Sequence, residues 1–256
     1  MAAPRFTLTK AAYIPDDFSG FADTITVRDA DPNRCAPALD ELAAGLDGDP
    51  CADQIAAEVF DQDGRIELFA HYGRGVLGGL TSLAGIPLIY IANRQRVMGL
   101  AELNKCVKLL QLAERFNYPL ISFTDLASFA GGPDAEARGI SQAAADLLNA
   151  FADLSVPKLN VMTGAALGSA YLAFNSKATG ADMVYAWPTA EIGLLRADAA
   201  VALFKRKALK AAADPQAMRQ ELEAEYARRD MGPTAAANLG LIDELIRPSA
   251  TRPRLY

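Results

Sequence analysis

The pattern of apolar and polar positions becomes regular from about residue 52 and predicts alternating strands and helices. Residues 66–72 and 75–82 are rich in apolar side chains on either side of a glycine-containing turn, which indicates two strands. Short apolar runs typical of buried strands follow at 88–92, 120–123, 159–162 and 183–185.

Segments with helical spacing separate these strands. Residues 100–116 place apolar side chains, among them Leu103, Val107 and Leu110, at the spacing of one helix face. Further helices are predicted at 134–154, from near Ser169, and at 198–211, 215–229 and 233–238. This order implies parallel strands joined by right-handed crossovers, so the sequence predicts an α/β fold with a parallel sheet and C-terminal helices. Sites in such sheets gather where strands end and helix N-termini point inward.

The first 50 residues differ from the rest of the chain. They are rich in Asp, Pro and Ala, with the turn signals DPN and DGDP. We predict an N-terminal arm over residues 1–50, partly irregular, with one short helix near 36–46. Residues 51–256 then form the single regular domain.

Composition and charge exclude several classes of protein. The chain of 256 residues is half hydrophobic and carries a net charge of −6, which disfavours nucleic-acid binding. Its three cysteines, Cys35, Cys51 and Cys106, are far apart, so neither a metal site nor a disulfide framework is expected, and a reducing compartment fits best. The chain shows no signal peptide and no apolar run near the ~20 residues that span a bilayer. We expect a cytoplasmic protein.

The single histidine, His71, limits the possible chemistry. A Ser-His-Asp or Cys-His nucleophile could only be built around this residue. Its apolar–polar surroundings predict a partly buried strand histidine instead. Enzymatic chemistry in this chain would therefore rest on backbone groups or on a cofactor supplied by another molecule.

Two strand-to-helix turns could carry that chemistry. The first, at 123–140, holds Gly131 and Gly132 before Pro133, which is also the pattern of an ordinary helix start. The second, at 160–174, is rich in small residues from Gly164 to Ala170. Backbone N–H groups there could hold a developing oxyanion, although close packing of a helix on a sheet also requires small residues.

Three segments of the chain resemble the carboxyltransferase subunits of propionyl-CoA and related acyl-CoA carboxylases. They are LISFTDLASFAGGPDAEARGI at 120–140, VPKLNVMTGAALGSAYLAFNSKATGADMVYAWPTAEIGLL at 156–195, and LGLIDELIRPSATRPRL at 239–255. The resemblance extends from about residue 55 to the end. It implies a crotonase-like fold of the ββα-superhelix type.

In that family, the N-terminal half mostly holds the acyl-CoA and the C-terminal half mostly receives biotin from a carrier protein. The resemblance covers only the C-terminal half. It therefore implies biotin as cofactor on a separate carrier protein, an acyl-CoA-binding carboxyltransferase subunit as partner, and an acyl-CoA or acyl-carrier thioester as substrate. It also implies a trimer-based hetero-oligomer.

The family's Gly-Gly-Ala segment, whose backbone amides bind the biotin ureido oxygen, matches Gly168, Ser169 and Ala170. The resemblance thus implies Ser169 and Ala170 as oxyanion donors and Gly168 as a biotin-binding residue. N–H groups at a helix start stabilise such charge without any titrating side chain. Gly131 and Gly132 would shape the biotin pocket.

The sequence departs from the family pattern at three places. Ser169 replaces a glycine, which a backbone role tolerates unless φ must be positive. Leu172 stands where an acyl-selecting side chain is often Asp or Ile, so the acyl group is expected to be unusual. Ala127, Ser128 and Phe129 replace Pro-Gly-Phe, and Phe129 could pack either against biotin or in the core.

Two other functions stay open at this point. A biotin-independent decarboxylase or hydrolase of the crotonase type would need its own CoA-binding surface, for which Arg94, Arg96, Lys105 and Lys108 could serve, although a solvated helix face is the common fate of such charges. A non-catalytic half that only completes an oligomer is the third hypothesis. Neither the acyl group nor the direction of transfer follows from the sequence.

Overall fold

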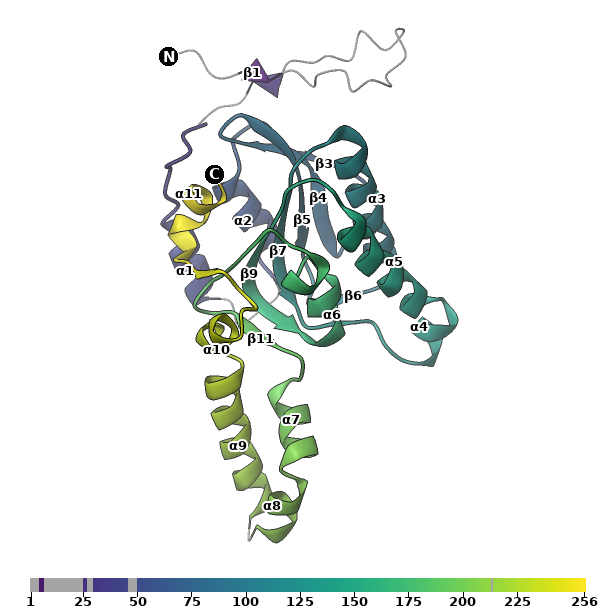
Figure 1. Cartoon of the computed structure of the whole chain (residues 1–256), viewed down its shortest axis with the longest axis vertical. Helices are drawn as coiled ribbons and strands as arrows, with labels where there is room; N and C mark the ends of the chain where they lie inside the picture. The colour runs from purple at the N-terminus through teal and green to yellow at the C-terminus, as the bar shows by residue number, and fades with distance from the viewer. Residues whose placement is uncertain (1–4, 7–24, 27–29, 46–49, 213) are drawn as a thin grey trace.

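The chain is built around one eight-stranded sheet, seen in a computed structural model that describes residues 5–6, 25–26, 30–45, 50–212 and 214–256 (Figure 1). The strand order is β12-β10-β9-β7-β5-β4-β3, and β11 pairs with β9 beyond this path. The strands are β3 (Ile66–Glu67), β4 (Val76–Leu83), β5 (Ile86–Asn93), β7 (Leu120–Leu126), β9 (Lys158–Leu167), β10 (Met183–Ala186), β11 (Glu191–Gly193) and β12 (Glu244–Leu245). Strands β5, β7, β9, β10 and β12 are mutually parallel, which confirms the predicted α/β fold with a parallel sheet.

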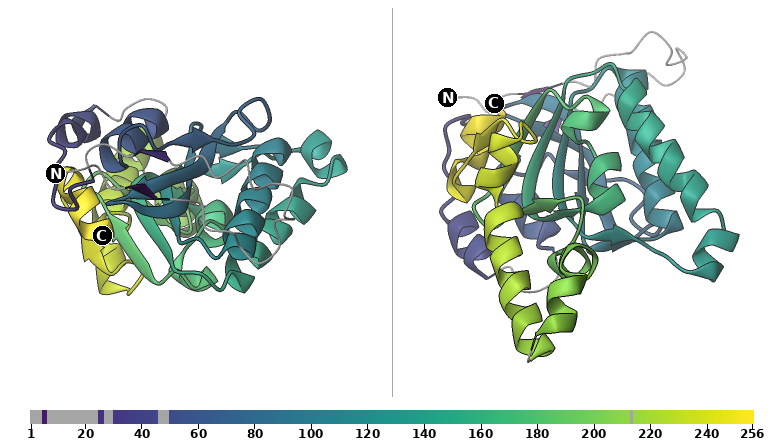
Figure 2. Two further views of the ribbon diagram at one scale, coloured as in Figure 1. Left: turned by 90° about the horizontal axis from the view of Figure 1, so that it is seen from above. Right: turned by 60° about the horizontal axis from the view of Figure 1, so that its bottom comes forward.

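Helices cover both faces of this sheet. The side chains of β5 alternate between two hydrophobic clusters, with Tyr90 in one and Ile89 and Ile91 in the other. The Tyr90 cluster also contains residues of the helices α1 (Ala38–Ala44), α2 (Ala52–Val59) and α11 (Thr251–Leu255). The other cluster contains residues of α3 (Leu100–Phe116) and α5 (Ile140–Asp153). Figure 2 shows these two layers on opposite sides of the sheet. A strand buried on both faces explains why β5 is almost continuously apolar.

The helices agree with the predicted ones in most places. They are α1 (Ala38–Ala44), α2 (Ala52–Val59), α3 (Leu100–Phe116), α4 (Pro133–Ala137), α5 (Ile140–Asp153), α6 (Gly168–Ala173), α7 (Ala197–Phe204), α8 (Arg206–Ala211), α9 (Pro215–Asp230), α10 (Pro233–Asn238) and α11 (Thr251–Leu255). The predicted helices at 100–116 and 233–238 are confirmed at both ends. Two short strand pairs complete the fold: β1 (Arg5–Phe6) with β2 (Ile25–Thr26), and β6 (Val97–Met98) with β8 (Ser128–Phe129).

The predicted strand at 66–72 is wrong after Glu67. Phe69 has a φ of 54°, and the Tyr72 N–H donates to the Phe69 carbonyl at 2.9 Å, so the chain turns there. His71 lies in this turn and is exposed, which corrects the expectation of a partly buried strand histidine. The apolar–polar alternation of this segment predicts a strand, and nothing in it indicates the turn, because a positive φ is rare for an aromatic residue such as Phe69.

Two predicted long helices are each two helices. The segment at 134–154 is broken at Gly139, whose φ of +89° is left-handed and ends the α-helical path. The segment at 198–211 is broken at Lys205, which ends α7 and precedes α8. In both cases the apolar spacing continues across the break, so the pattern predicts one helix.

Most of the predicted N-terminal arm lies outside the described residues. The predicted helix at 36–46 is observed as α1, and its Leu39 is fully buried in the same cluster as Leu255 of α11. The Ala36 N–H also donates to the Ser249 carbonyl at 3.1 Å. The domain boundary at residue 50 stays a prediction, but α1 packs onto the C-terminal end of the chain.

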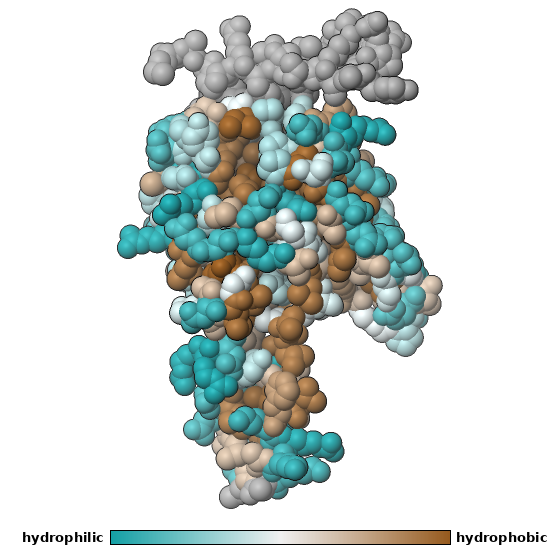
Figure 3. All heavy atoms as spheres, viewed as in Figure 1, coloured by the Kyte–Doolittle hydropathy of each residue, from teal (hydrophilic) through white to brown (hydrophobic). Residues whose placement is uncertain are grey.

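Helices α7, α8 and α9 project from the sheet as a hairpin (Figure 1). Leu203 and Phe204 at the end of α7 are each 65% exposed, and α9 has no buried residue. Figure 3 shows the apolar surface that runs along this projection. Among the helices of the described residues, none combines the length and the apolar character that crossing a membrane requires.

Candidate functional site at the carboxyl ends of β7 and β9

Strand β9 passes directly into α6 through a glycine turn. Gly168 has a φ of +62°, a conformation that side chains rarely adopt, whereas Ser169 is not among the positive-φ residues. Glycine is thus required at the first position of the predicted Gly-Ser-Ala segment, and serine is tolerated at the second. The N–H groups of Ser169 and Ala170, as the second and third residues of α6, have no partner within the helix.

These two donors differ in exposure. Ser169 is exposed, while Ala170 is fully buried in the cluster that also holds Phe174. An added Cβ at Gly168 would meet only the Leu194 carbonyl oxygen, at 3.8 Å. The turn is therefore open beside Gly168 and Ser169 and closed around the side chain of Ala170.

Helix α6 is held between two hydrophobic clusters. Ala170 and Phe174 belong to one, and Tyr171 belongs to the other, with residues of β10. The Phe174 ring packs against Phe151 of α5 with ring centroids 5.4 Å apart. Phe129 lies in β8, which contacts α6, and its half-buried ring packs against the Ala170 cluster.

The other predicted site residues are more dispersed. Gly131 and Gly132 are exposed, and a Cβ added to either would meet nothing within 4 Å. Gly132 has a φ of +100° and precedes α4. Leu172 is half-buried against the cluster around Met162 and Ala166. The structure thus brings Phe129 to α6, and it leaves the two glycines on the surface.

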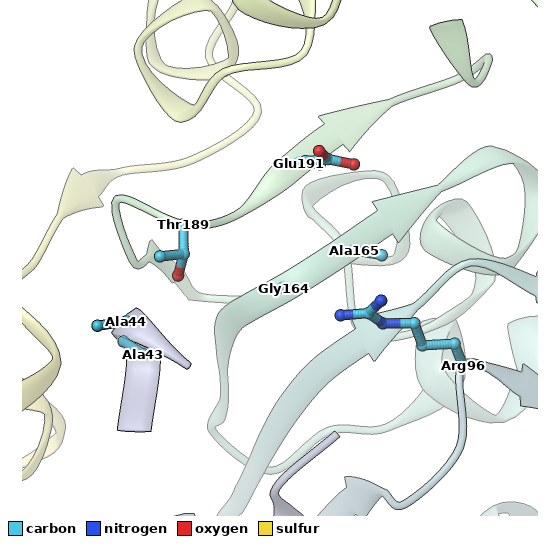
Figure 4. A pocket seen from close by; sticks show the side chains of 7 residues that line it. All are labelled: Ala43, Ala44, Arg96, Gly164, Ala165, Thr189 and Glu191. Atoms are coloured by element: carbon cyan, nitrogen blue, oxygen red, sulfur yellow. The ribbon is translucent and has the colours of Figure 1, made fainter. Parts of the chain in front are cut away.

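A cavity of about 360 Å³ lies beside this turn, across β9 and β11 (Figure 4). Its lining residues are Ala43, Ala44, Arg96, Gly164, Ala165, Thr189 and Glu191. Arg96, which was considered for CoA binding, and Gly164 and Ala165 of the predicted small-residue turn line this cavity. The residues predicted to bind biotin do not line it.

Asp125 organises the floor of this region. Its carboxylate is 2% exposed, accepts from Arg96 Nε at 2.9 Å and accepts from the Ala165 N–H at 2.8 Å. The Asn93 side chain brackets the Asp125 backbone, since its Oδ1 accepts the Asp125 N–H at 2.9 Å and its Nδ2 donates to the Asp125 carbonyl. A Cβ on Gly164 would lie 2.6 Å from Asp125 Oδ1, so only glycine fits there.

Sequence reasoning missed this cluster because the sheet assembles it from three strand ends. The available signal was Asp125 itself, a carboxylate at the end of the apolar strand LISFTDL. A charged residue is almost never buried unless it is paired. Its partner Arg96 is 29 residues away in sequence, and periodicity carries no information about such a pair.

The four cations considered for a CoA-binding surface all contact other groups of the chain. Arg94 forms ion pairs with Asp53 at 2.7 Å and Glu67 at 2.9 Å, and Arg96 pairs with Asp125. Lys105 is fully buried and donates to the Val76 carbonyl at 2.7 Å, so a solvated helix face is wrong for this residue.

Lys108 lies over two aromatic rings, 4.9 Å from the Tyr72 centroid and 5.6 Å from that of Phe69. Lys108, the fourth of these cations, therefore makes cation–π contacts with both rings.

Cys106 of α3 is buried in the same hydrophobic cluster as Ala170 of α6. Burial raises the pKa of the Cys106 thiol to about 12, so this thiol stays protonated. Over the residues that the structure describes, no group of three or more His, Cys, Asp or Glu side chains could hold a metal ion. The chemistry that the turn can supply is the stabilisation of a negatively charged oxygen by backbone N–H groups.

Comparisons with known proteins identify the family and the fold of this chain. The family model described as Carboxyl transferase domain matches residues 11–256. The chain is 34% identical over 230 residues to the propionyl-CoA carboxylase carboxyltransferase subunit of Haloferax mediterranei, covering 88% of this chain and 45% of that protein. It is also 34% identical over 205 residues to methylmalonyl-CoA decarboxylase subunit alpha of Propionigenium modestum, covering 78% of this chain and 39% of that protein.

A solved structure has the same fold. The transcarboxylase 12S hexamer, determined with methylmalonyl-coenzyme A and methylmalonic acid bound, superimposes with a TM-score of 0.84 at 29% identity over 91% of this chain and 46% of that one. The chain thus spans less than half the length of these relatives. The match of the family model over residues 11–256 shows that this chain belongs to the carboxyl transferase domain family.

Proposed function

We propose that this chain is the biotin-side half of a carboxyltransferase that moves a carboxyl group between biotin on a carrier protein and an acyl thioester. The observation that carries the proposal is the glycine turn of α6, which places two N–H groups at the carboxyl end of β9 in a member of this family. Relatives at 32% identity are biotin-dependent acetyl-/propionyl-coenzyme A carboxylase beta6 subunits of Mycobacterium tuberculosis.

The residues present fit biotin at this turn. When bound, biotin supplies a ureido group whose nitrogen carries the transferred carboxyl group. Gly168, without a side chain and open on one side, lets a ureido oxygen approach the backbone. Ser169 then donates its N–H, and Ala170 donates from the buried side of the same turn. The donors stabilise negative charge on that oxygen without gaining or losing a proton themselves.

Phe129 and the acyl-selecting position are further parts of the proposal. Phe129 packs beside α6, where its half-buried ring can contact a bound bicycle. Gly131 and Gly132 would form the outer rim of the pocket. Leu172 would limit the acyl group by its bulk. Relatives named as a propionyl-CoA carboxylase subunit and as a methylmalonyl-CoA decarboxylase subunit support small acyl groups in either direction of transfer.

A second subunit is required by this proposal. The proposal gives this chain an acyl-CoA-binding carboxyltransferase subunit as its partner, in a trimer-based hetero-oligomer. The α7–α9 hairpin, with Leu203 and Phe204 exposed, supports such a partner, because apolar surfaces of this kind mark protein–protein contacts. We place the complex in the cytoplasm.

The structure favours this proposal over a stand-alone CoA enzyme. The four cations that could have bound CoA phosphates are engaged with carboxylates, a carbonyl or aromatic rings. Calorimetry of the isolated chain with a CoA thioester tests the alternative. A stand-alone CoA enzyme must bind the thioester, whereas our proposal predicts no such binding by the isolated chain.

Co-purification tests the proposed partners. The tagged chain is isolated from its native lysate and probed for biotinylated protein and for a second crotonase-like polypeptide. Both should be present, and a Phe204→Asp variant should recover less of the second polypeptide. Recovery of the chain alone, as a homo-oligomer, would refute the split carboxyltransferase.

A further inference from the structure

A fully buried asparagine follows α6 and takes no part in the function described above. Asn175 has a φ of +47°, in the left-handed region that asparagine tolerates better than most residues. Its side-chain Nδ2 donates to Ser122 Oγ at 2.7 Å and to the Leu159 carbonyl at 2.9 Å. One side chain thus ties the exit of α6 to β7 and to β9.

These bonds continue into a buried polar network. The Ser122 hydroxyl donates to Asn160 Oδ1 at 2.9 Å, and the Thr124 hydroxyl donates to the same oxygen at 2.8 Å. Asn175, Ser122, Asn160 and Thr124 are all fully buried. Asn175 Oδ1 and Asn160 Nδ2 have no hydrogen-bond partner among the described residues, so the network is held by the bonds that Asn175 Nδ2 and the two hydroxyls donate. Polar groups in an apolar core are costly unless they are paired, so each of these bonds favours one arrangement of the elements it joins.

Helix α6 depends on such anchors because it has only six residues. A helix of this length is not stable through its own hydrogen bonds. Its entry is fixed where Gly168 leaves β9, whose Leu167 pairs with Gly193 of β11. Its exit is fixed by Asn175 and by the Ser176 hydroxyl, which donates to the Leu172 carbonyl at 2.9 Å.

We infer that Asn175 is a positioning residue for carboxyl transfer, because its side chain holds α6 in the orientation that aims the first-turn N–H groups at the acceptor oxygen. This inference rests on the proposed function. Donors at an oxyanion act only when they are held in place before the charge develops. Asn175 itself is buried behind the helix and touches no substrate.

The test compares Asn175→Gly with Thr251→Val in the complex with the co-purified subunit. Glycine adopts the left-handed backbone readily and removes the whole side chain, including the amide that makes these bonds. Thr251 is a matched control, since its buried Oγ1 accepts from Trp187 Nε1 at 2.9 Å in a different part of the fold, at α11. Two readouts are taken: carboxyl transfer from malonyl-CoA or methylmalonyl-CoA to free biotin, per folded molecule, and amide hydrogen exchange over residues 168–173.

Asn175→Gly should lower kcat at least about tenfold, with KM for free biotin changed less than about twofold. It should raise amide exchange over residues 168–173 about tenfold. Thr251→Val should lower the melting temperature and leave both readouts unchanged.

Unchanged exchange in Asn175→Gly, or a loss of kcat no larger than in Thr251→Val, would overturn the inference. If the wild-type complex transfers nothing to biotin, the proposed function fails, and the exchange measurement still decides whether Asn175 positions α6.

Discussion

At the scale of single residues, Ser169 separates a backbone role from a side-chain role. Ser169→Ala removes the hydroxyl and keeps the N–H, so transfer to free biotin should stay within about twofold. Ser169→Pro removes the N–H at a helix position that tolerates proline, so kcat should fall about 10²–10³-fold with little change in melting temperature. Equal activity of the two variants would place the oxyanion elsewhere or make the chain a scaffold.

Asp61 and Arg252 form the most buried ion pair described, with 2.6 Å between Oδ1 and Nη2 and both side chains 0% exposed. Asp61 also accepts from Ser82 Oγ and from the N–H groups of Ala84 and Gly85. Asp61→Ala would leave the Arg252 charge buried without this partner, so urea unfolding should show a loss of about 3–5 kcal/mol.

Asp198→Ala serves as the control for this variant. It breaks an exposed pair and should cost less than about 1 kcal/mol. A loss below about 1 kcal/mol in Asp61→Ala would mean that the pair does not join the C-terminal helix to the sheet in solution.

Acid stability should depend on Arg94. Hydrogen bonds from Arg94 lower the pKa of both Asp53 and Glu67 below their ordinary values. A lowered folded-state pKa gives stability that is complete above the unfolded pKa, near 4, and is lost as pH falls through the folded value. Arg94→Met should therefore reduce stability above pH ~5 and flatten the decline below it, as measured by urea unfolding between pH 3 and 7. Parallel curves for the two proteins would contradict this.

At the scale of elements, the packing of β7 against β9 at Asp125 depends on Gly164, which has no side chain. A Cβ at Gly164 would overlap the Asp125 carboxylate and push it from Arg96 and from the Ala165 N–H. Gly164→Ala should cost about 1–3 kcal/mol in the free energy of unfolding. Gly131→Ala is the matched control, because its new methyl group meets nothing. Similar stabilities of both variants would argue against this packing.

The sequence predicted elements well where local signals and packing agree. The helix at 100–116 follows Gly99 and is capped at its C-terminus by Asn117, whose φ of 54° is left-handed, a common way for a helix to end. The prediction of one continuous helix at 134–154 was wrong at Gly139, because an isolated glycine is compatible with a continuous helix as well as with a break. Strand β11 was missed because three residues, Glu191–Gly193, carry no periodicity.

One part of the candidate site could be predicted from local sequence and another part could not. The Gly168 turn could be predicted, since a strand, a glycine and a helix follow one another in sequence. The cluster of Asp125, Arg96 and Gly164 could not, because the parallel pairing of β5, β7 and β9 brings these residues together across long sequence separations. The space beside Gly168 could not be predicted either, because its nearest neighbour, the Leu194 carbonyl oxygen, lies after β11 in the sequence.

At the scale of the whole molecule, the projecting α7–α9 hairpin is the surface that our proposal assigns to a partner. Helices of the described residues cover both faces of the sheet. The α7–α9 hairpin has only Ala200 and Val201 buried in α7 and no buried residue in α9. The transcarboxylase 12S structure that superimposes on this chain is a hexamer, and this chain covers 46% of the matching chain.

The most direct test of the proposed function is carboxyl transfer by the assembled complex. The chain and the crotonase-like subunit that co-purifies with it are mixed with malonyl-CoA or methylmalonyl-CoA, with and without free biotin. The account predicts decarboxylation of the thioester that depends on biotin and is lost when this chain is omitted or carries Ser169→Pro. Decarboxylation or hydrolysis that proceeds equally without biotin, or by the isolated chain, would contradict it.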